Sequence, residues 1–119
     1  MANKESIKDF TKALDALKFS GMYEGDFFLT WEKTRDELDA VFNVANALRH
    51  LRERNISTRV FDSGLGVSLF RDNSTRTRFS FASACNLLGL EVQDLDEGKS
   101  QIAHGETVRE TANMISFMA

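Results

Sequence analysis

Proline is absent from the 119 residues of this chain, cysteine occurs once, and no apolar run is long enough to cross a membrane. The single thiol, Cys85, excludes an internal disulfide, and its alanine and leucine neighbours favour a small buried side chain. We therefore expect a reducing, cytoplasmic compartment. The N-terminus mixes charged with apolar residues and does not look like a signal peptide. With proline missing, the seven glycines are the main markers of turns.

An excess of one charge is also lacking, because the formal net charge is −3 with both signs interleaved along the chain. No general basic field exists to attract nucleic acid or an anionic membrane, so we expect neither as a partner. Any anion site must be local. The composition, 42% hydrophobic and 28% charged, is typical of a globular protein, and the length suits one compact core.

Two helices are predicted in the first half of the chain. Apolar residues recur at helical spacing between Ile7 and Leu17, which predicts a short amphipathic helix within an N-terminal extension, residues 1–25. A second helix is predicted over residues 34–54. Thr34 and Glu37 have the spacing of a capping box, and apolar residues follow them at helical spacing.

The pattern changes in the second half of the chain. A short apolar run with branched side chains predicts a strand at Gly66–Phe70, and a second strand is plausible at Leu90–Leu95. Between them, the apolar segment Phe79–Leu88 predicts a helix that Gly89 closes. The polar residues Asp96–Gly105 are expected to form a loop.

Another capping box, from Thr107 to Glu110, predicts a last helix near the end of the chain. Helices alternating with strands favour an α/β fold with a parallel sheet, as a three-layer α/β/α domain. Two parallel strands make an inadequate sheet, because such sheets are stable when several strands are covered on both faces. We therefore expect the domain to be truncated here and the polypeptide to continue past Ala119.

The loop between the first strand and the following helix, residues 71–78, lies where α/β folds bind ligands. The first turn of a helix favours acidic side chains, because unpaired N–H groups and the positive end of the helix dipole meet there. This first turn carries Arg76 and Arg78 instead. An anion between the two guanidinium groups would offset their repulsion from the dipole, and phosphate is the obvious candidate.

Ser74, Thr75 and Thr77 add hydroxyl donors in the same small volume. A plainer interpretation remains open, in which Ser74 only caps the helix and both arginines lie in solvent. Known nucleotide motifs do not compete, because the sequence lacks a G-x-x-x-x-G-K-[ST] loop and Gly64-Leu65-Gly66 precedes its strand.

Two motifs in this order resemble the aspartate and ornithine carbamoyltransferase family. The first is Ser74-Thr75-Arg76-Thr77-Arg78, preceded by Leu69-Phe70 and followed by Phe79-Ser80-Phe81. The second, Ser100–Thr107, looks like the mobile loop that members of the family extend into a neighbouring subunit's site. The likeness reaches back through residues 34–54 and suggests a branch near the ornithine enzymes.

The resemblance implies that residues 1–119 are a partial carbamoyl phosphate-binding domain without the acceptor-binding domain, so that this chain alone is inactive. Ser74, Thr75, Arg76 and Thr77 would hold the phosphate, with Arg76 and Thr77 catalytic. Arg78 would be structural, because the helix turns it away from the ligand. The reaction would move a carbamoyl group to an amino group of an amino acid or related small amine and release phosphate, with neither metal nor other cofactor.

The second motif implies contacts made in trans in a homo-oligomer, expected to be a trimer. Gln101 resembles a carbamoyl phosphate contact, and Ser100 and His104 are possible further contacts, although His104 can equally be a solvated residue. Asp96 and Glu97 are expected to face water. An alternative to the enzyme is a non-catalytic paralogue or regulatory module that keeps the phosphate site.

Overall fold

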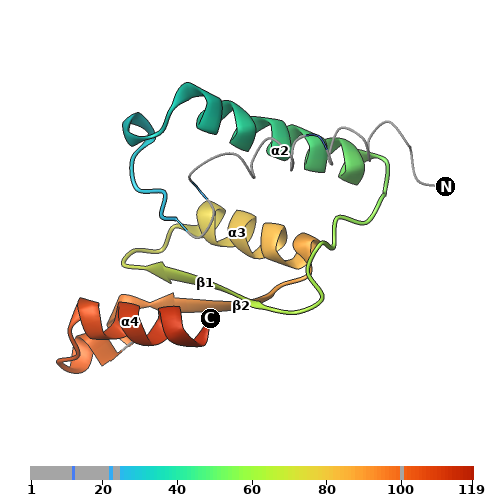
Figure 1. Cartoon of the computed structure of the whole chain (residues 1–119). Coiled ribbons are helices and arrows are strands. Elements are labelled where there is room, and N and C mark those ends of the chain that lie inside the picture. Colours follow the sequence, from blue (N-terminus) through green and yellow to red (C-terminus); the bar gives the residue numbers. More distant parts are fainter. Residues whose placement is uncertain (1–11, 13–21, 23–24, 100) are drawn as a thin grey trace. The chain divides into compact units, whose positions relative to one another are not determined.

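A computed structural model describes residues 12, 22, 25–99 and 101–119 of the chain. The chain divides into two compact units, Met1–Thr58 and Arg59–Ala119. Their helices and strands are drawn in Figure 1. The helix predicted between Ile7 and Leu17 lies outside the described residues, apart from Lys12.

The first unit contains a 3-10 turn, η1 (Thr30–Glu32), and a long helix, α2 (Arg35–Glu53). The predicted capping box is confirmed. The Thr34 hydroxyl accepts a hydrogen bond from the Glu37 amide, and the Thr34 amide donates to the Glu37 carboxylate, each at 3.2 Å. These two bonds satisfy groups that a helix start leaves unpaired, so α2 begins where local chemistry sets it. Its buried residues share one face: Ala40, Ala47 and Leu51.

The second unit is built on a pair of parallel strands, β1 (Leu65–Phe70) and β2 (Glu91–Asp96), connected by the helix α3 (Thr75–Leu88). The predicted α/β class with a parallel sheet is confirmed. Each strand begins and ends within one residue of its predicted bounds. The register pairs Ser68 with Asp94 and Phe70 with Asp96. Residues paired in a parallel ladder point to the same side of the sheet, which brings these four side chains together.

Helix α3 packs closely on β1, and glycines mark the two closest approaches. A Cβ atom at Gly66 would lie 2.5 Å from the Sγ atom of Cys85, which is itself buried. Gly89 ends α3 in the left-handed conformation with φ of 99°, as predicted, and a Cβ there would lie 2.1 Å from the Phe61 carbonyl oxygen. Both positions require the absence of a side chain.

The segment after β2 is more ordered than the predicted loop. Asp96 is the last residue of β2, and two 3-10 turns follow it, η2 (Glu97–Lys99) and η3 (Gln101–His104). Such turns are frequent in short connections, and polar sequences do not distinguish them from irregular loops. Helix α4 (Val108–Met118) comes next and lies on the side of the strands away from α3 (Figure 1). Its predicted capping box, from Thr107 to Glu110, is confirmed.

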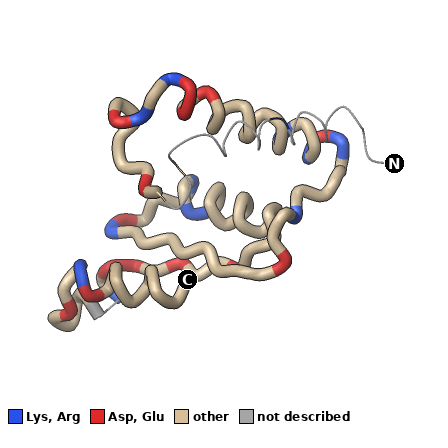
Figure 2. The backbone as a smooth tube through the Cα atoms, in the orientation of Figure 1, with Lys and Arg blue, Asp and Glu red and all other residues tan. Residues whose placement is uncertain are grey.

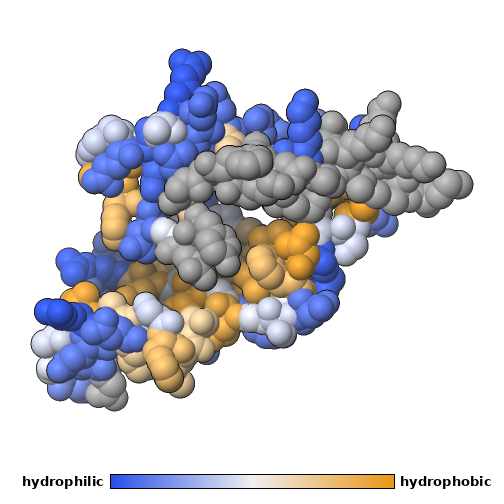
Figure 3. Space-filling view, viewed as in Figure 1, coloured by the Kyte–Doolittle hydropathy of each residue, from blue (hydrophilic) through white to orange (hydrophobic). Residues whose placement is uncertain are grey.

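Apolar side chains remain exposed on the second unit. Figure 3 shows apolar surface gathered over the strands and α4. Leu65 and Leu69 of β1 keep 41% and 44% of their surface exposed, and Phe117 of α4 keeps 91%. Contiguous apolar surface of this kind is typical of faces that meet other protein. None of the described helices combines the length and the apolarity needed to span a bilayer.

Candidate anion site at the start of α3

The candidate site is the connection from the carboxyl end of β1 to the first turn of α3. β1 ends at Phe70 and α3 begins at Thr75, so the predicted order of strand, loop and helix is confirmed. The sequence run from Ser74 to Thr77 places all four candidate residues at this helix start, and all four are exposed. Ligands bind at this edge in α/β folds, because helix N-termini there present free N–H groups.

The start of α3 differs from the starts of α2 and α4, because no side chain caps it. Ser74 occupies the N-cap position in a left-handed conformation, with φ of 39° and ψ of 47°, and its hydroxyl accepts no hydrogen bond from any described residue of the first turn. The first turn also contains no acidic residue. The interpretation that Ser74 only caps the helix is therefore wrong. Its hydroxyl and the first N–H groups of α3 stay available to an external acceptor.

Basic residues gather at this helix start (Figure 2), but their charges are not equally compensated. The Arg71 guanidinium forms a two-bond ion pair with Glu97, with an Nε to Oε2 distance of 2.6 Å. Arg78 pairs with both Asp94 and Asp96. Within the described part of the chain, Arg76 forms no ion pair. Arg76 is thus the uncompensated cation next to the free amides.

Arg78 does not share an anion with Arg76, as the charge pattern alone suggested. Its Nη1 atom donates to Asp94 at 2.7 Å, and its Nη2 atom donates to Asp96 and, at 2.8 Å, to the carbonyl oxygen of Asp72. Residues two apart on a helix point about 200° away from each other, so a face that turns Arg78 toward β2 turns Arg76 away from it. These contacts agree with the structural role that the family resemblance implied for Arg78.

The same contacts shift the ionisation of the cluster. The Asp96 carboxylate, as a hydrogen-bond acceptor, raises the pKa of Arg78, and Asp94 adds to the effect. The hydrogen bond from Ser68 and then those from Arg78 lower the pKa of Asp94. The carboxylate of Glu97 raises the pKa of Arg71. All these groups are charged at neutral pH, so the cluster holds fixed charges.

The expectation that Asp96 and Glu97 face water is wrong. Asp96 pairs with Arg78 and, at 3.7 Å, with Lys99, whereas Glu97 pairs with Arg71. The sequence reasoning also missed Asp94 and Ser68. Their alternation with Asp96 and Phe70 on two neighbouring strands was the available signal, but it becomes informative only once the register of the strands is known.

The remaining candidates lie after β2. Ser100 lies outside the described residues. The backbone of Gln101 opens the turn η3, and the exposed His104 ends it. Among the described residues, no group of three or more His, Cys, Asp or Glu side chains is placed to hold a metal ion.

Comparison with known protein families assigns most of the chain. Residues 26–119 match the model of the aspartate/ornithine carbamoyltransferase, carbamoyl-P binding domain. This range includes the whole candidate site and both of the capping boxes.

Three curated relatives illustrate the similarity. A protein of Escherichia coli (strain K12) named "Putative carbamoyltransferase YgeW" is 67% identical over 115 residues, which cover 97% of this chain and 29% of that protein. The aspartate carbamoyltransferase catalytic subunit of Saccharophagus degradans is 37% identical over 84% of this chain and 29% of its own length. The ornithine carbamoyltransferase of Geobacter metallireducens is 31% identical over 70% of this chain and 27% of its own length. The chain thus spans less than a third of each of these relatives.

Proposed function

Because this chain belongs to the aspartate/ornithine carbamoyltransferase family and contains its carbamoyl phosphate-binding domain, we propose that Ser74, Thr75, Arg76 and Thr77 bind the phosphate of carbamoyl phosphate. The intact protein would transfer the carbamoyl group to an amino group of an amino acid or related small amine and release phosphate. The uncapped start of α3, with an unpaired arginine in its first turn, is the observation that carries the proposal.

Arg76 has the central role in this proposal. A phosphate at the start of α3 would accept hydrogen bonds from the first N–H groups and from the adjacent hydroxyls, while Arg76 supplies the charge that no carboxylate neutralises. Carbamoyl transfer builds negative charge on the carbonyl oxygen during attack and on the phosphate as it leaves. Fixed donors stabilise such developing charge because they need no reorganisation during the reaction. Thr77 is placed to reach the carbonyl oxygen, and no metal or other cofactor is needed.

Residues of a second subunit would complete the site. We propose a homo-oligomer, with a trimer as the expected form, in which Gln101 contacts carbamoyl phosphate in trans and Ser100 and His104 add further contacts. The exposed apolar surface on β1 and α4 supports assembly with other protein. Mixing two inactive variants, Arg76→Ala and Gln101→Ala, should then restore measurable activity, because some sites combine an intact residue from each parent. Inactive mixtures that nevertheless exchange subunits would contradict sharing of the site.

The test of the activity is phosphate release from carbamoyl phosphate by the intact protein, measured with a panel of amino acids and small amines. We expect one amine class to accelerate release and to acquire the carbamoyl group, detected by mass spectrometry. Arg76→Ala should abolish the acceleration, whereas Arg49→Ala, which removes an exposed arginine of α2, should not. Carbamoyl phosphate binding with no transfer to any amine would favour the non-catalytic paralogue instead.

A further inference from the structure

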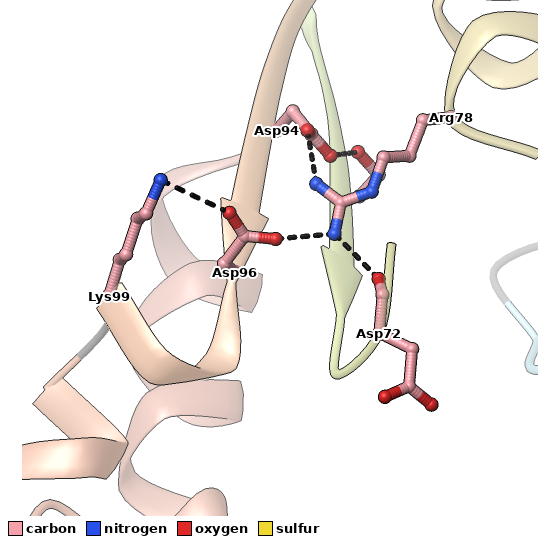
Figure 4. A network of polar contacts seen from close by, with 6 residues as sticks. Asp72, Arg78, Asp94, Asp96 and Lys99 are labelled. Atoms are coloured by element: carbon pink, nitrogen blue, oxygen red, sulfur yellow. Dashed lines mark hydrogen bonds and ion pairs between the residues drawn. The ribbon is translucent and has the colours of Figure 1, made fainter. Parts of the chain in front are cut away.

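The Arg78 side chain connects three segments of the second unit. It rises from the first turn of α3, donates to Asp94 and Asp96 of β2, and donates to the carbonyl oxygen of Asp72 in the loop that leads into α3 (Figure 4). No other described side chain joins that loop, the start of α3 and β2. Helix, loop and strand are therefore held at one point by a single guanidinium group.

The partners of Arg78 are themselves fixed from β1. The buried Ser68 hydroxyl donates to the second oxygen of Asp94 at 2.6 Å, and the Phe70 ring lies 4.7 Å from the guanidinium carbon. Both residues stand opposite the aspartates in the strand register. Only 18% of the Arg78 side chain is exposed. This is a built cluster rather than a surface ion pair, which would usually be mobile and screened by salt.

We propose that the cluster of Arg78, Asp94 and Asp96 positions the first turn of α3, and with it the amides and Arg76, for phosphate. This inference rests on the proposed function. Arg78 is a positioning residue in it, because two carboxylates already occupy its charge and the helix turns it away from Arg76. The aspartates have a second effect, since they neutralise Arg78 and leave Arg76 as the cation that the phosphate meets.

The geometry requires arginine at position 78. Asp94 and Asp96 are two residues apart on one strand, so they point to the same side at a separation of about 7 Å. The fork of a guanidinium reaches both carboxylates and the Asp72 carbonyl oxygen from two different nitrogens. A lysine keeps the charge but offers one compact ammonium group, so it cannot hold all three partners at these distances. Charge without the fork should therefore fail to hold the helix start.

The test compares Arg78→Lys with Arg71→Lys in the intact protein, because Arg71 also pairs with a carboxylate but does not contact β2 through α3. Carbamoyl phosphate is titrated by calorimetry, and Kd is expressed per folded protein, with the folded fraction taken from circular dichroism. We expect Arg78→Lys to raise Kd about tenfold and Arg71→Lys to change it less than twofold. A residue that served folding alone would change the folded fraction and leave the Kd of folded molecules unchanged.

A second variant keeps the test decisive if Arg78→Lys does not fold. Asp96→Asn preserves the shape of the side chain, leaves Asp94 paired, and should raise Kd about threefold. Wild-type Kd values in both folded variants, or in Asp96→Asn alone where the lysine variant is unfolded, would overturn the positioning role while leaving the proposed function intact. Failure of the wild-type protein to bind carbamoyl phosphate would overturn the proposed function, and the positioning role with it.

Discussion

The contact between Gly66 of β1 and Cys85 of α3 predicts a strong coupling between two substitutions. A Cβ atom at position 66 would lie 2.5 Å from the Cys85 Sγ atom, about 1 Å closer than non-bonded carbon and sulfur atoms allow. Forcing atoms into a packed core costs about 1–3 kcal/mol, and we expect Gly66→Ala to lower the free energy of unfolding by about 2 kcal/mol. Removal of the sulfur in Cys85→Ala should cost about 1 kcal/mol, through lost burial and a small cavity.

The double variant should be about as stable as Cys85→Ala alone. Without the sulfur, the nearest atoms to the new Cβ are Phe81 Cζ at 3.5 Å and the Cβ of residue 85 at 3.6 Å, which are ordinary contacts. The two substitutions should therefore show a favourable coupling of about 2 kcal/mol in a double-mutant cycle.

The assay is equilibrium unfolding of the intact protein in urea, followed by far-ultraviolet circular dichroism at a fixed protein concentration, because assembly changes apparent stability. Additive effects of the two substitutions would refute the close packing of α3 on β1.

Three further predictions concern the frame around the site. Gly89→Ala should lower the free energy of unfolding by more than about 3 kcal/mol, because φ is 99° and the new Cβ would meet the Phe61 carbonyl oxygen; urea unfolding measures it. Thr107→Ala should cost about 1 kcal/mol by the same assay, because it removes the hydroxyl that caps α4. Asp94 has a pKa lowered from its ordinary value of 3.8, so its contribution to stability is present above that pH and is lost as the pH falls below it toward the folded-state pKa. Melting temperatures between pH 6 and pH 3 should therefore fall less steeply in Asp94→Asn than in the wild type, and parallel curves would contradict the ion pairing.

Local chemistry in the sequence was sufficient to predict much of the fold. Both capping boxes, at Thr34 and Thr107, bind as their spacing indicates, and Gly89 ends α3 in the expected conformation. These features succeed because each depends on residues within a few positions of one another. The change from helical spacing to short branched runs located both strands, so the α/β class followed from the order of elements.

The parts that sequence reasoning missed depend on residues far apart in the chain. The partners of Arg78 follow from the register of β1 against β2 and from the side of the sheet that α3 covers, neither of which local patterns encode. The left-handed backbone of Ser74 was equally hidden, because serine is a common N-cap that usually does bind the first turn. The sequence identified the arginines of the site but could not tell the paired Arg78 from the unpaired Arg76.

The central claim, that the first turn of α3 binds the phosphate of carbamoyl phosphate, is tested most directly by calorimetric titration of carbamoyl phosphate into the intact wild-type protein and into Arg76→Ala. Loss of two charge-assisted hydrogen bonds, at about 1.5 kcal/mol each, predicts a Kd about 100-fold higher in the variant, with Arg49→Ala unchanged. A Kd for Arg76→Ala within twofold of the wild-type value would contradict the assignment of the site.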